Sequence, residues 1–207
     1  LTANTSYTAV VRSVCAVNEY SAWTTPVPFY TGYCIPVGAT NYYLTNVTTT
    51  GGTTNINNTT EASAGGYGDY SATISCSAMQ STDITISLTP SSGTNFFYIW
   101  IDWNNDFDFA DEGETIAATT SYTSDYSITY TVPASQAIGS YRMRVANSWS
   151  GSITPCGPAS YGEYEDYTFN VLEFISGTVR GEVTDCYTGA LLEGVTLSIA
   201  GSTTTTD

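Results

Sequence analysis

The residues best suited to chemistry lie in one acidic stretch, WIDWNNDFDFADEGE at residues 100–114. Three of its side chains, at positions 102, 104 and 106, follow the D-x-[DN]-x-[DN] spacing that begins calcium loops. Ca²⁺ takes roughly six to eight oxygen ligands at about 2.3–2.6 Å, so a short loop must direct several carboxylates to one point. The sequence therefore predicts a calcium site whose candidate ligands are Asp102, Asn104, Asp106, Asp108, Asp111, Glu112 and Glu114.

The later residues of this stretch have separate expected roles. Asp108 can add its side chain or its carbonyl oxygen. Asp111, Glu112 or Glu114 would complete the coordination shell, Glu114 with both carboxylate oxygens. Without an ion, so many carboxylates in one turn repel each other. The alternative is a solvated acidic turn that holds no ion and uses its Asn and Asp residues as turn formers.

A second acidic cluster, GEYEDY at 162–167, precedes an alternating apolar pattern. If this cluster begins a strand, Glu163 and Glu165 share a face with the apolar residues that follow, and Glu165 points towards the core. An unpaired charge there is costly, so the cluster needs a cationic partner.

Arg142 and Arg144 are the only basic residues between positions 32 and 173. We predict buried ion pairs that join these arginines to Glu163 and Glu165. Calcium ligation by Glu163, Glu165 or Asp166 is the competing role for the cluster. Asp69 in GYGDY either reaches the site or caps a turn.

Composition excludes several catalytic systems. The chain contains no His and no Lys, which excludes Ser–His–Asp and Cys–His catalysis, HExxH zinc sites and Ser–Lys chemistry. Paired carboxylates could still hydrolyse glycosides, but nothing in the sequence marks one of them as a general acid. We therefore expect no enzymatic activity.

The charge balance narrows the class of partner. The 207 residues carry 4 basic against 19 acidic side chains, a formal net charge of -15. Nucleic acid and anionic membrane surfaces need a basic face, so neither is an expected partner. A divalent cation is favoured instead. The sequence has no apolar run long enough to cross a bilayer, so no membrane insertion is expected.

Five cysteines, at positions 15, 34, 76, 156 and 186, form no CxxC pair. With no His, zinc binding is not expected. Wide spacing in a chain rich in Tyr and Thr favours at least one disulfide and an oxidising compartment. Because five is odd, at least one thiol is free.

Alternating apolar and polar residues recur along the chain, and no segment has a helical period. The clearest examples are DITISL (83–88), YSITYTV (126–132), YRMRV (141–145) and YTFNV (167–171). The run NFFYIWIDW (95–103) is apolar on both faces, which predicts a central strand covered on both sides. Trp100 and Trp103 are expected in the core. The pattern predicts an all-β protein of antiparallel β-sandwich modules in tandem.

The two ends of the chain resemble parts of other modules. Residues 1–31 resemble the last two strands of a fibronectin type III domain, with Tyr7 at the tyrosine corner. Residues 175–207 resemble the start of a carboxypeptidase regulatory-like domain, whose signature residues match Gly181, Val183, Asp185, Thr188, Gly189, Leu192 and Gly194. The expected organisation is a partial fibronectin-like module (1–31), a complete sandwich (32–173) and a partial regulatory-like sandwich (174–207).

The central stretch, about 33–172, resembles the GEVED domain of secreted and surface proteins of Bacteroidota. The matching motifs are YC (33–34), GGYGDY (65–70), WIDWNNDFDF (100–109), DEGE (111–114), YRMRV (141–145), PCG (155–157) and GEYEDYTFNV (162–171). This chain has Tyr164 where the family has Val, and Phe107 where calcium loops and the family usually have Gly.

The resemblance implies several further features. Cys34 and Cys156 open and close the family pattern, so a disulfide between them is expected. It would restrict the unfolded chain by roughly 4–5 kcal/mol in the loop-entropy model. It also implies a secreted or cell-surface location, export by the type 9 system and neighbouring modules of the same polypeptide or filament as partners.

Two functions follow as expectations. The first is a non-catalytic, calcium-stabilised structural or adhesive module of a large secreted or surface protein, with a surface glycan or protein as ligand. The second is an accessory substrate- or carbohydrate-binding module of a secreted hydrolase or protease. Aromatic residues that could stack on a sugar are Tyr67, Tyr70, Trp149, Tyr161 and Tyr164.

Overall fold

The structure is a computed structural model that describes residues 1, 5–174, 181–199 and 202–206. Arg180 and the last residue, Asp207, lie outside the described residues. The chain divides into two compact units, Leu1–Phe174 and Ile175–Asp207. The module boundaries expected near residues 31 and 173 remain predictions.

The larger unit is built from strands, as the alternating pattern predicts. Its central elements are β5 (Leu44–Thr50), β6 (Asn57–Thr59), the 3-10 helix η1 (Ala64–Gly66), β7 (Tyr67–Asp69), β8 (Ser75–Met79), β9 (Asp83–Pro90), β10 (Phe96–Ile101), β11 (Thr115–Ala118), β12 (Tyr126–Thr131), β13 (Gly139–Ser148) and β14 (Gly162–Leu172). The described residues contain no α-helix. The all-β prediction is therefore confirmed.

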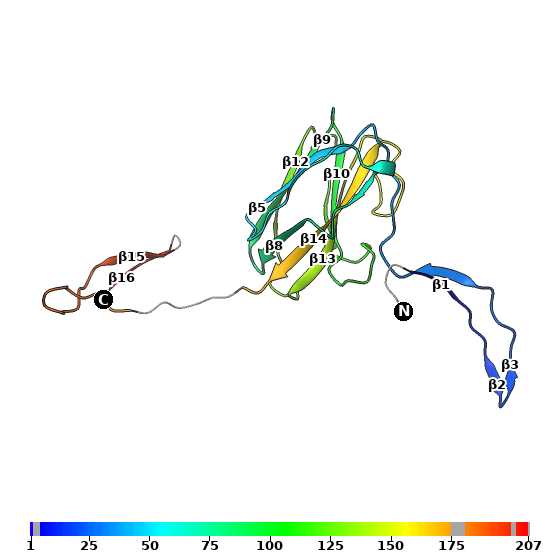
Figure 1. Ribbon diagram of the computed structural model, residues 1–207, viewed down its shortest axis with the longest axis horizontal. Helices are drawn as coiled ribbons and strands as arrows, with labels where there is room; N and C mark the ends of the chain where they lie inside the picture. The colour runs from blue at the N-terminus through cyan, green and yellow to red at the C-terminus, as the bar shows by residue number, and fades with distance from the viewer. Residues whose placement is uncertain (2–4, 175–180, 200–201, 207) are drawn as a thin grey trace. The chain divides into compact units, whose positions relative to one another are not determined.

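Two sheets form the sandwich. One has the order β12-β9-β5-β6, and the other has the order β11-β10-β13-β14-β7, with β8 also paired to β14. Figure 1 shows β5, β9 and β12 in one layer and β10, β13 and β14 in the other. Most pairings are antiparallel, but β7 and β8 both run parallel to β14. These two short strands follow one another along the same edge of β14, so β14 is an interior strand along most of its length.

The core between the sheets follows the predicted alternation. Ile84, Ile86 and Leu88 of β9 are fully buried against Phe169 and Val171 of β14 within one apolar cluster. The neighbouring strand β12 turns the partly buried residues of its own alternating pattern, Tyr126, Ile128 and Tyr130, towards the same cluster. Period-2 patterns were sufficient to identify these faces because successive side chains of a strand point to opposite sides.

β10 is covered on both faces, as its apolar run predicts. Phe97, Ile99 and Ile101 point into the core between the sheets. Tyr98 and Trp100 belong to a second cluster on the opposite face, together with Phe109 of the loop that follows, Ala146, Ala159 and Tyr164. Trp103 packs against the first cluster.

Two loop segments cover this second face and are joined covalently. Cys34 and Cys156 form a disulfide across a sequence separation of 122 residues, in agreement with the expected pairing. The Ala159 amide also donates to the Val37 carbonyl at 2.9 Å. Of the remaining cysteines, Cys15 and Cys186 are exposed, and burial raises the pKa of the Cys76 thiol to about 12.

The flanking residues form separate two-stranded ribbons. Near the N-terminus, β1 (Ser6–Ala9) pairs with β4 (Val27–Tyr30), and β2 (Val14–Ala16) pairs with β3 (Glu19–Tyr20). In the smaller unit, β15 (Thr196–Ile199) pairs with β16 (Ser202–Thr205). The fibronectin-like and regulatory-like resemblances of these segments remain predictions. None of the described residues forms a helix with the length and hydrophobicity that crossing a membrane would require.

Close backbone contacts where β14 begins depend on Gly38, Gly66 and Gly162. The Gly38 amide donates to the Gly65 carbonyl at 2.8 Å, and the Ala39 amide donates to the Gly162 carbonyl at 2.7 Å. A Cβ on Gly162 would lie 2.1 Å from the Asn147 carbonyl oxygen, and one on Gly66 would lie 2.2 Å from the Gly38 carbonyl carbon. Backbone packing therefore requires glycine at position 162, the first residue of the GEYED motif.

We predict that Gly162→Ala destabilises the larger unit by roughly 1–3 kcal/mol, because the clashing atom belongs to an interior strand that cannot rotate away. Urea unfolding measures the loss. Gly157→Ala is the matched control, since its closest contact is the Thr154 hydroxyl, a side-chain atom that can move. Equal effects of the two substitutions would contradict this explanation.

Candidate functional site

Asp102 anchors the acidic loop at the end of β10. Its backbone amide donates to the Arg142 carbonyl at 3.0 Å, which continues the pairing with β13. Its carboxylate is fully buried and accepts three bonds, from the Asn105 amide (2.7 Å), the Phe107 amide (3.1 Å) and the Tyr33 hydroxyl (2.6 Å). Buried charge is tolerated here because backbone and hydroxyl donors surround it.

The alternate spacing of Asn and Asp produces a series of Asx turns. The Asn104 side chain accepts the Asp106 amide at 3.0 Å, and the Asp106 carboxylate accepts the Asp108 amide at 3.1 Å. The Asp108 carboxylate then accepts the Ala110 amide at 2.8 Å. Each side chain orders the backbone two residues ahead, which is the local reason that the loop takes this path.

Three of the seven predicted ligands come together. The carboxylates of Asp106, Asp108 and Asp111 are exposed, and one oxygen from each lies within 4.8 Å of the others. The Asn104 side-chain amide donates to Asp106 at 3.1 Å and to Asp111 at 2.5 Å, so it is a neighbour of this group through its nitrogen.

The other predicted ligands have different positions. Asp102 is used inside the fold, as described above. Glu114 is buried and accepts the backbone amides of Trp103 (2.9 Å) and Asp111 (3.3 Å), and burial raises its pKa. Glu112 is exposed and is not a member of the group of three.

The donor atoms suit a hard divalent cation. All three grouped side chains offer carboxylate oxygen, with no nitrogen or sulfur ligand, and oxygen is what Ca²⁺ prefers. The backbone also has the left-handed turns that such a loop needs, at Asn105 (φ 60°), Phe107 (φ 76°) and Gly113 (φ 91°). Phe107 therefore takes a conformation that normally favours glycine.

Tyr33 links this loop to the outer face of the β10–β13–β14 sheet. Its hydroxyl holds Asp102, its ring contacts Phe107 and Phe109 with centroids 5.4 and 5.5 Å away, and the Arg142 guanidinium lies 4.6 Å above it. Tyr33 precedes a disulfide cysteine, so the acidic loop is coupled through packing to the covalently closed loops.

Arg144 lies at the centre of that outer face and is fully buried. It makes a bidentate pair with Asp166, at 2.6 Å through Nε and 2.8 Å through Nη2. Its remaining bonds go to the Pro155 carbonyl (2.7 Å), the Cys34 carbonyl (3.0 Å) and the Cys34 sulfur (3.2 Å). Burial alone would lower the pKa of Arg144, but Asp166 outweighs it and raises the pKa.

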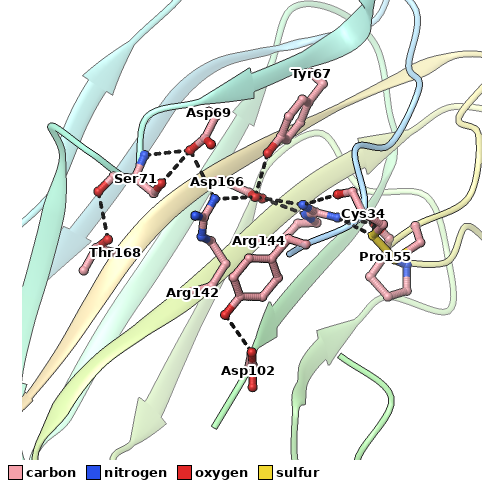
Figure 2. A network of polar contacts seen from close by, with 12 residues as sticks. Cys34, Tyr67, Asp69, Ser71, Asp102, Arg142, Arg144, Pro155, Asp166 and Thr168 are labelled. Carbon is pink, nitrogen blue, oxygen red and sulfur yellow. Dashed lines mark hydrogen bonds and ion pairs between the residues drawn. A yellow bond between two sulfur atoms is a disulfide. The ribbon is translucent and has the colours of Figure 1, made fainter. Parts of the chain in front are cut away.

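Asp166 is shared by both arginines and by a tyrosine. It also accepts from Arg142 Nη1 at 2.9 Å and from the Tyr67 hydroxyl at 2.8 Å, while Arg142 reaches Asp69 at 3.2 Å. Figure 2 shows Asp166 between the two guanidinium groups, with Cys34 and Pro155 beyond Arg144. Asp69 also accepts from the Ser71 amide and hydroxyl, so it pairs with an arginine and caps a turn.

The predicted pairing of the arginines with Glu163 and Glu165 is wrong. In the β13–β14 register Arg144 lies opposite Asp166, and Glu165 lies opposite Val145. Directly opposite residues share a face, so the arginines and Asp166 are on the outer face while both glutamates point into the sandwich. The expected inward direction of Glu165 is correct, and it is this direction that separates it from the arginines.

Glu163 is instead satisfied by backbone amides. Its two carboxylate oxygens accept from the Leu44 amide at 2.9 Å and the Ser63 amide at 2.6 Å. It therefore ties the start of β14 to the start of β5 and to the segment before η1. Burial raises its pKa, and these backbone bonds oppose the rise.

The contacts of Glu165 fit a protonated carboxyl group. The Thr60 hydroxyl lies 2.9 Å from both the Leu44 carbonyl and Glu165 Oε1, and its single hydrogen cannot serve two acceptors. All groups are satisfied if Thr60 donates to Leu44 and a protonated Oε1 donates to Thr60. Oε2 accepts from the Tyr167 hydroxyl at 2.7 Å, which itself accepts from Asn58. Burial, with the charge of Glu163 nearby, raises the pKa of Glu165 to about 7.

Sequence reasoning missed the parts of this arrangement that depend on pairing between distant segments. Asp166 was considered only as a calcium ligand, although its position within GEYED alternates correctly for the arginine face. Thr60 carries no signal of its contact with Glu165, which lies 105 residues later in the sequence.

We predict that Asp166→Asn lowers the free energy of unfolding by about 3–5 kcal/mol, because it leaves the buried Arg144 charge uncompensated. Urea denaturation measures the change. Asp69→Asn is the matched control, because this exposed partner of Arg142 should contribute less than about 1 kcal/mol. Similar losses for the two variants would show that burial of the pair does not determine its importance.

Stability should also depend on the proton of Glu165. Between the ordinary pKa of 4.5 and the raised value of about 7, the folded protein keeps a proton that the unfolded chain has released. The free energy of unfolding therefore falls as pH rises through this window, by roughly 2–4 kcal/mol. Glu165→Gln should remove this fall and be more stable than the parent above about pH 7.

The substitution Glu163→Gln distinguishes the role of Glu163 from that of Glu165. The Glu163 carboxylate accepts two backbone amides, and a Gln side chain would direct an NH₂ group at one of them. We expect a loss of roughly 1–3 kcal/mol at all pH values. Chemical denaturation across pH measures the free energy of unfolding of both variants and of the parent. If the difference between Glu165→Gln and the parent did not change with pH, the protonation argument would be contradicted.

Comparison with known proteins agrees with the central motifs. No curated protein matches the chain. A family model does match, over residues 96–170, a range that contains the acidic loop, both arginines and the GEYED cluster. This part of the central sandwich is thus similar to the family described as the GEVED domain.

Proposed function

We propose that the chain is a non-catalytic structural or adhesive module of a large secreted or cell-surface bacterial protein, stabilised by calcium in the acidic loop. The carboxylate group of Asp106, Asp108 and Asp111 carries the proposal. Three like charges within 4.8 Å are unfavourable without a cation, and their oxygen chemistry favours Ca²⁺. Further backbone oxygens or waters would complete the shell.

The proposal that the module is not an enzyme rests on how its ionisable groups are used. The chain has no His or Lys, and each buried carboxylate described above is bound by backbone amides, arginines or hydroxyls. These partners hold the groups in fixed structural roles. The exposed carboxylates of the acidic loop favour metal coordination over proton transfer.

The location is inferred from the disulfide and the domain family. The Cys34–Cys156 bond is consistent with an oxidising, extracellular compartment. Resemblance to the GEVED domain supports a surface protein of Bacteroidota exported by the type 9 system. The partners we propose are neighbouring modules of the same polypeptide or filament, and a glycan or protein on a facing surface.

A role as accessory carbohydrate-binding module of a secreted hydrolase is the second candidate. The observation that favours it is the exposed aromatic ring of Phe107, which a left-handed backbone holds beside polar side chains. A catalytic motif elsewhere in the polypeptide would favour this role, and further repeated modules would favour the structural one.

The calcium proposal is tested by thermal unfolding of the full chain with calcium and with a chelator. At a calcium concentration about 100 times Kd, the stability gain is roughly 2.7 kcal/mol, equivalent to several degrees in Tm. The triple variant Asp106→Asn/Asp108→Asn/Asp111→Asn should lose this gain. In chelator it should be more stable than the parent, because the repulsion is removed while Asn still accepts the Asx-turn bonds.

Glu112→Gln is the matched control, because it removes a nearby exposed charge outside the group of three. It should retain the full calcium response. Asp102→Asn is less informative, since Asp102 is a buried acceptor that the fold needs with or without calcium. A parent Tm that ignores both calcium and chelator would refute the proposal.

A further inference from the structure

A small hollow lies beside the acidic loop, on the outer face of β13 and β14. Its cavity volume is about 210 Å³. We call it the Phe107 hollow, and its lining includes Tyr33, Asn105, Phe107, Ser140, Arg142 and Thr168. This size suits one sugar-sized ring rather than a large ligand, since drug-sized ligands occupy roughly 300–1,000 Å³.

The aromatic wall of the hollow is held on an unfavourable backbone. Phe107 has φ 76°, a left-handed conformation that costs a bulky residue about 1–2 kcal/mol relative to glycine. Its side chain does not offset this by entering the core, because the residue is 43% exposed. One edge contact with Tyr33 orients the ring at the rim of the hollow.

The polar groups beside this ring have unused hydrogen-bonding capacity. Within the described chain, Arg142 bonds only through Nη1, which leaves Nε and Nη2 without a partner on a side chain that is 19% exposed. Asn105, which also lines the hollow, donates through Nδ2 to the Ser140 carbonyl at 3.4 Å and keeps its Oδ1 as an acceptor. Donors and acceptors are therefore both available near one aromatic face.

The surrounding charge excludes ionic ligands. The Arg142 charge is already balanced by Asp69 and Asp166, and Phe107 lies between Asp106 and Asp108, so an anion is repelled. A metal ion finds no acidic side chain in the lining.

An extended peptide cannot add a strand at this position. Ser140 and Thr168 belong to paired strands, and the Arg142 carbonyl already accepts the Asp102 amide. The remaining ligand chemistry is a neutral molecule with one apolar face and several hydroxyl groups.

We propose that the Phe107 hollow binds one uncharged sugar ring of a glycan. The apolar face of the sugar lies on Phe107, its hydroxyl oxygens accept from Arg142 Nε and Nη2, and a hydroxyl hydrogen reaches Asn105 Oδ1. This inference rests on the adhesive role proposed above and supplies the ligand class for it.

The test uses the full chain and neutral probes, namely the methyl glycosides of glucose, galactose and mannose, and N-acetylglucosamine, with glucuronate as the charged counterpart. Saturation-transfer NMR detects contact, and titration gives Kd. We expect at least one neutral sugar to bind with Kd on the order of 1 mM, and glucuronate to bind more weakly.

Phe107→Gly is the decisive variant, because glycine accepts φ 76° and the substitution removes the ring without straining the loop. It should weaken binding by roughly three- to tenfold, the range expected for one stacked ring. Arg142→Lys keeps one charge for Asp166 but removes the Nε–Nη2 edge, and it should also weaken binding. The Tm of each variant establishes that it is folded.

Trp149→Ala is the matched control. Trp149 is an exposed aromatic residue (45%) that stacks with Tyr42 and lies outside the hollow. It should leave the sugar affinity unchanged. The proposal is overturned if no neutral sugar binds the folded parent, if Phe107→Gly binds as well as the parent, if glucuronate is preferred, or if Trp149→Ala alone abolishes binding.

Calcium and chelator arms separate this inference from the proposed function. Sugar binding that persists in chelator, with a Tm that ignores calcium, would support the hollow and refute calcium stabilisation. A calcium-dependent Tm in a protein that binds no neutral sugar would support calcium stabilisation and refute sugar binding in the Phe107 hollow.

Discussion

The bidentate pair between Arg144 and Asp166 is the interaction on which the rest of the larger unit depends. It lies between two interior strands, and the same guanidinium binds carbonyl oxygens of both segments that the disulfide joins. Burying an arginine is unfavourable unless every donor is used. Here five donated bonds, two to Asp166 and three to Cys34 and Pro155, satisfy that requirement. The position of the loops over the second apolar cluster follows from it.

A chain with 19 acidic and 4 basic residues must neutralise or solvate most of its carboxylates by other means. The buried carboxylates are satisfied by different kinds of partner. Asp166 takes the two arginines, Glu163 takes backbone amides, and Glu165 is satisfied in its protonated form. Among the described residues, the exposed carboxylates of Asp106, Asp108 and Asp111 accept only backbone amides and the Asn104 side chain, which is why this loop remains the place where an external cation is expected.

The GEYED cluster therefore has a structural meaning at each of its positions. Gly162 permits contact with β13, the two glutamates connect β14 to the opposite sheet, and Asp166 connects it to the covering loops. Tyr164, which replaces the Val of the family name, is fully buried in the second cluster and donates to the Thr154 and Gly157 carbonyls. Its burial excludes it from sugar stacking, contrary to the expectation from sequence.

The sequence by itself determined the features that depend on local periodicity and composition. Alternation identified the strands β9, β10, β12, β13 and β14 and their inward faces, because side chains in a strand alternate irrespective of its partners. The resemblance to the GEVED domain indicated the disulfide pair, and Asn and Asp spacing located the loop that forms successive Asx turns. The absence of His and Lys limited the chemistry available to the chain.

Only the tertiary structure decided which distant groups meet. The strand register placed Arg144 opposite Asp166, whereas sequence reasoning chose Glu165, because alternation specifies a face but not the partner across it. It also divided the seven predicted ligands into buried acceptors and an exposed group of three, and it placed Thr60 beside Glu165. These outcomes depend on contacts between distant residues, some of them more than 100 positions apart in the sequence. No local pattern encodes such contacts.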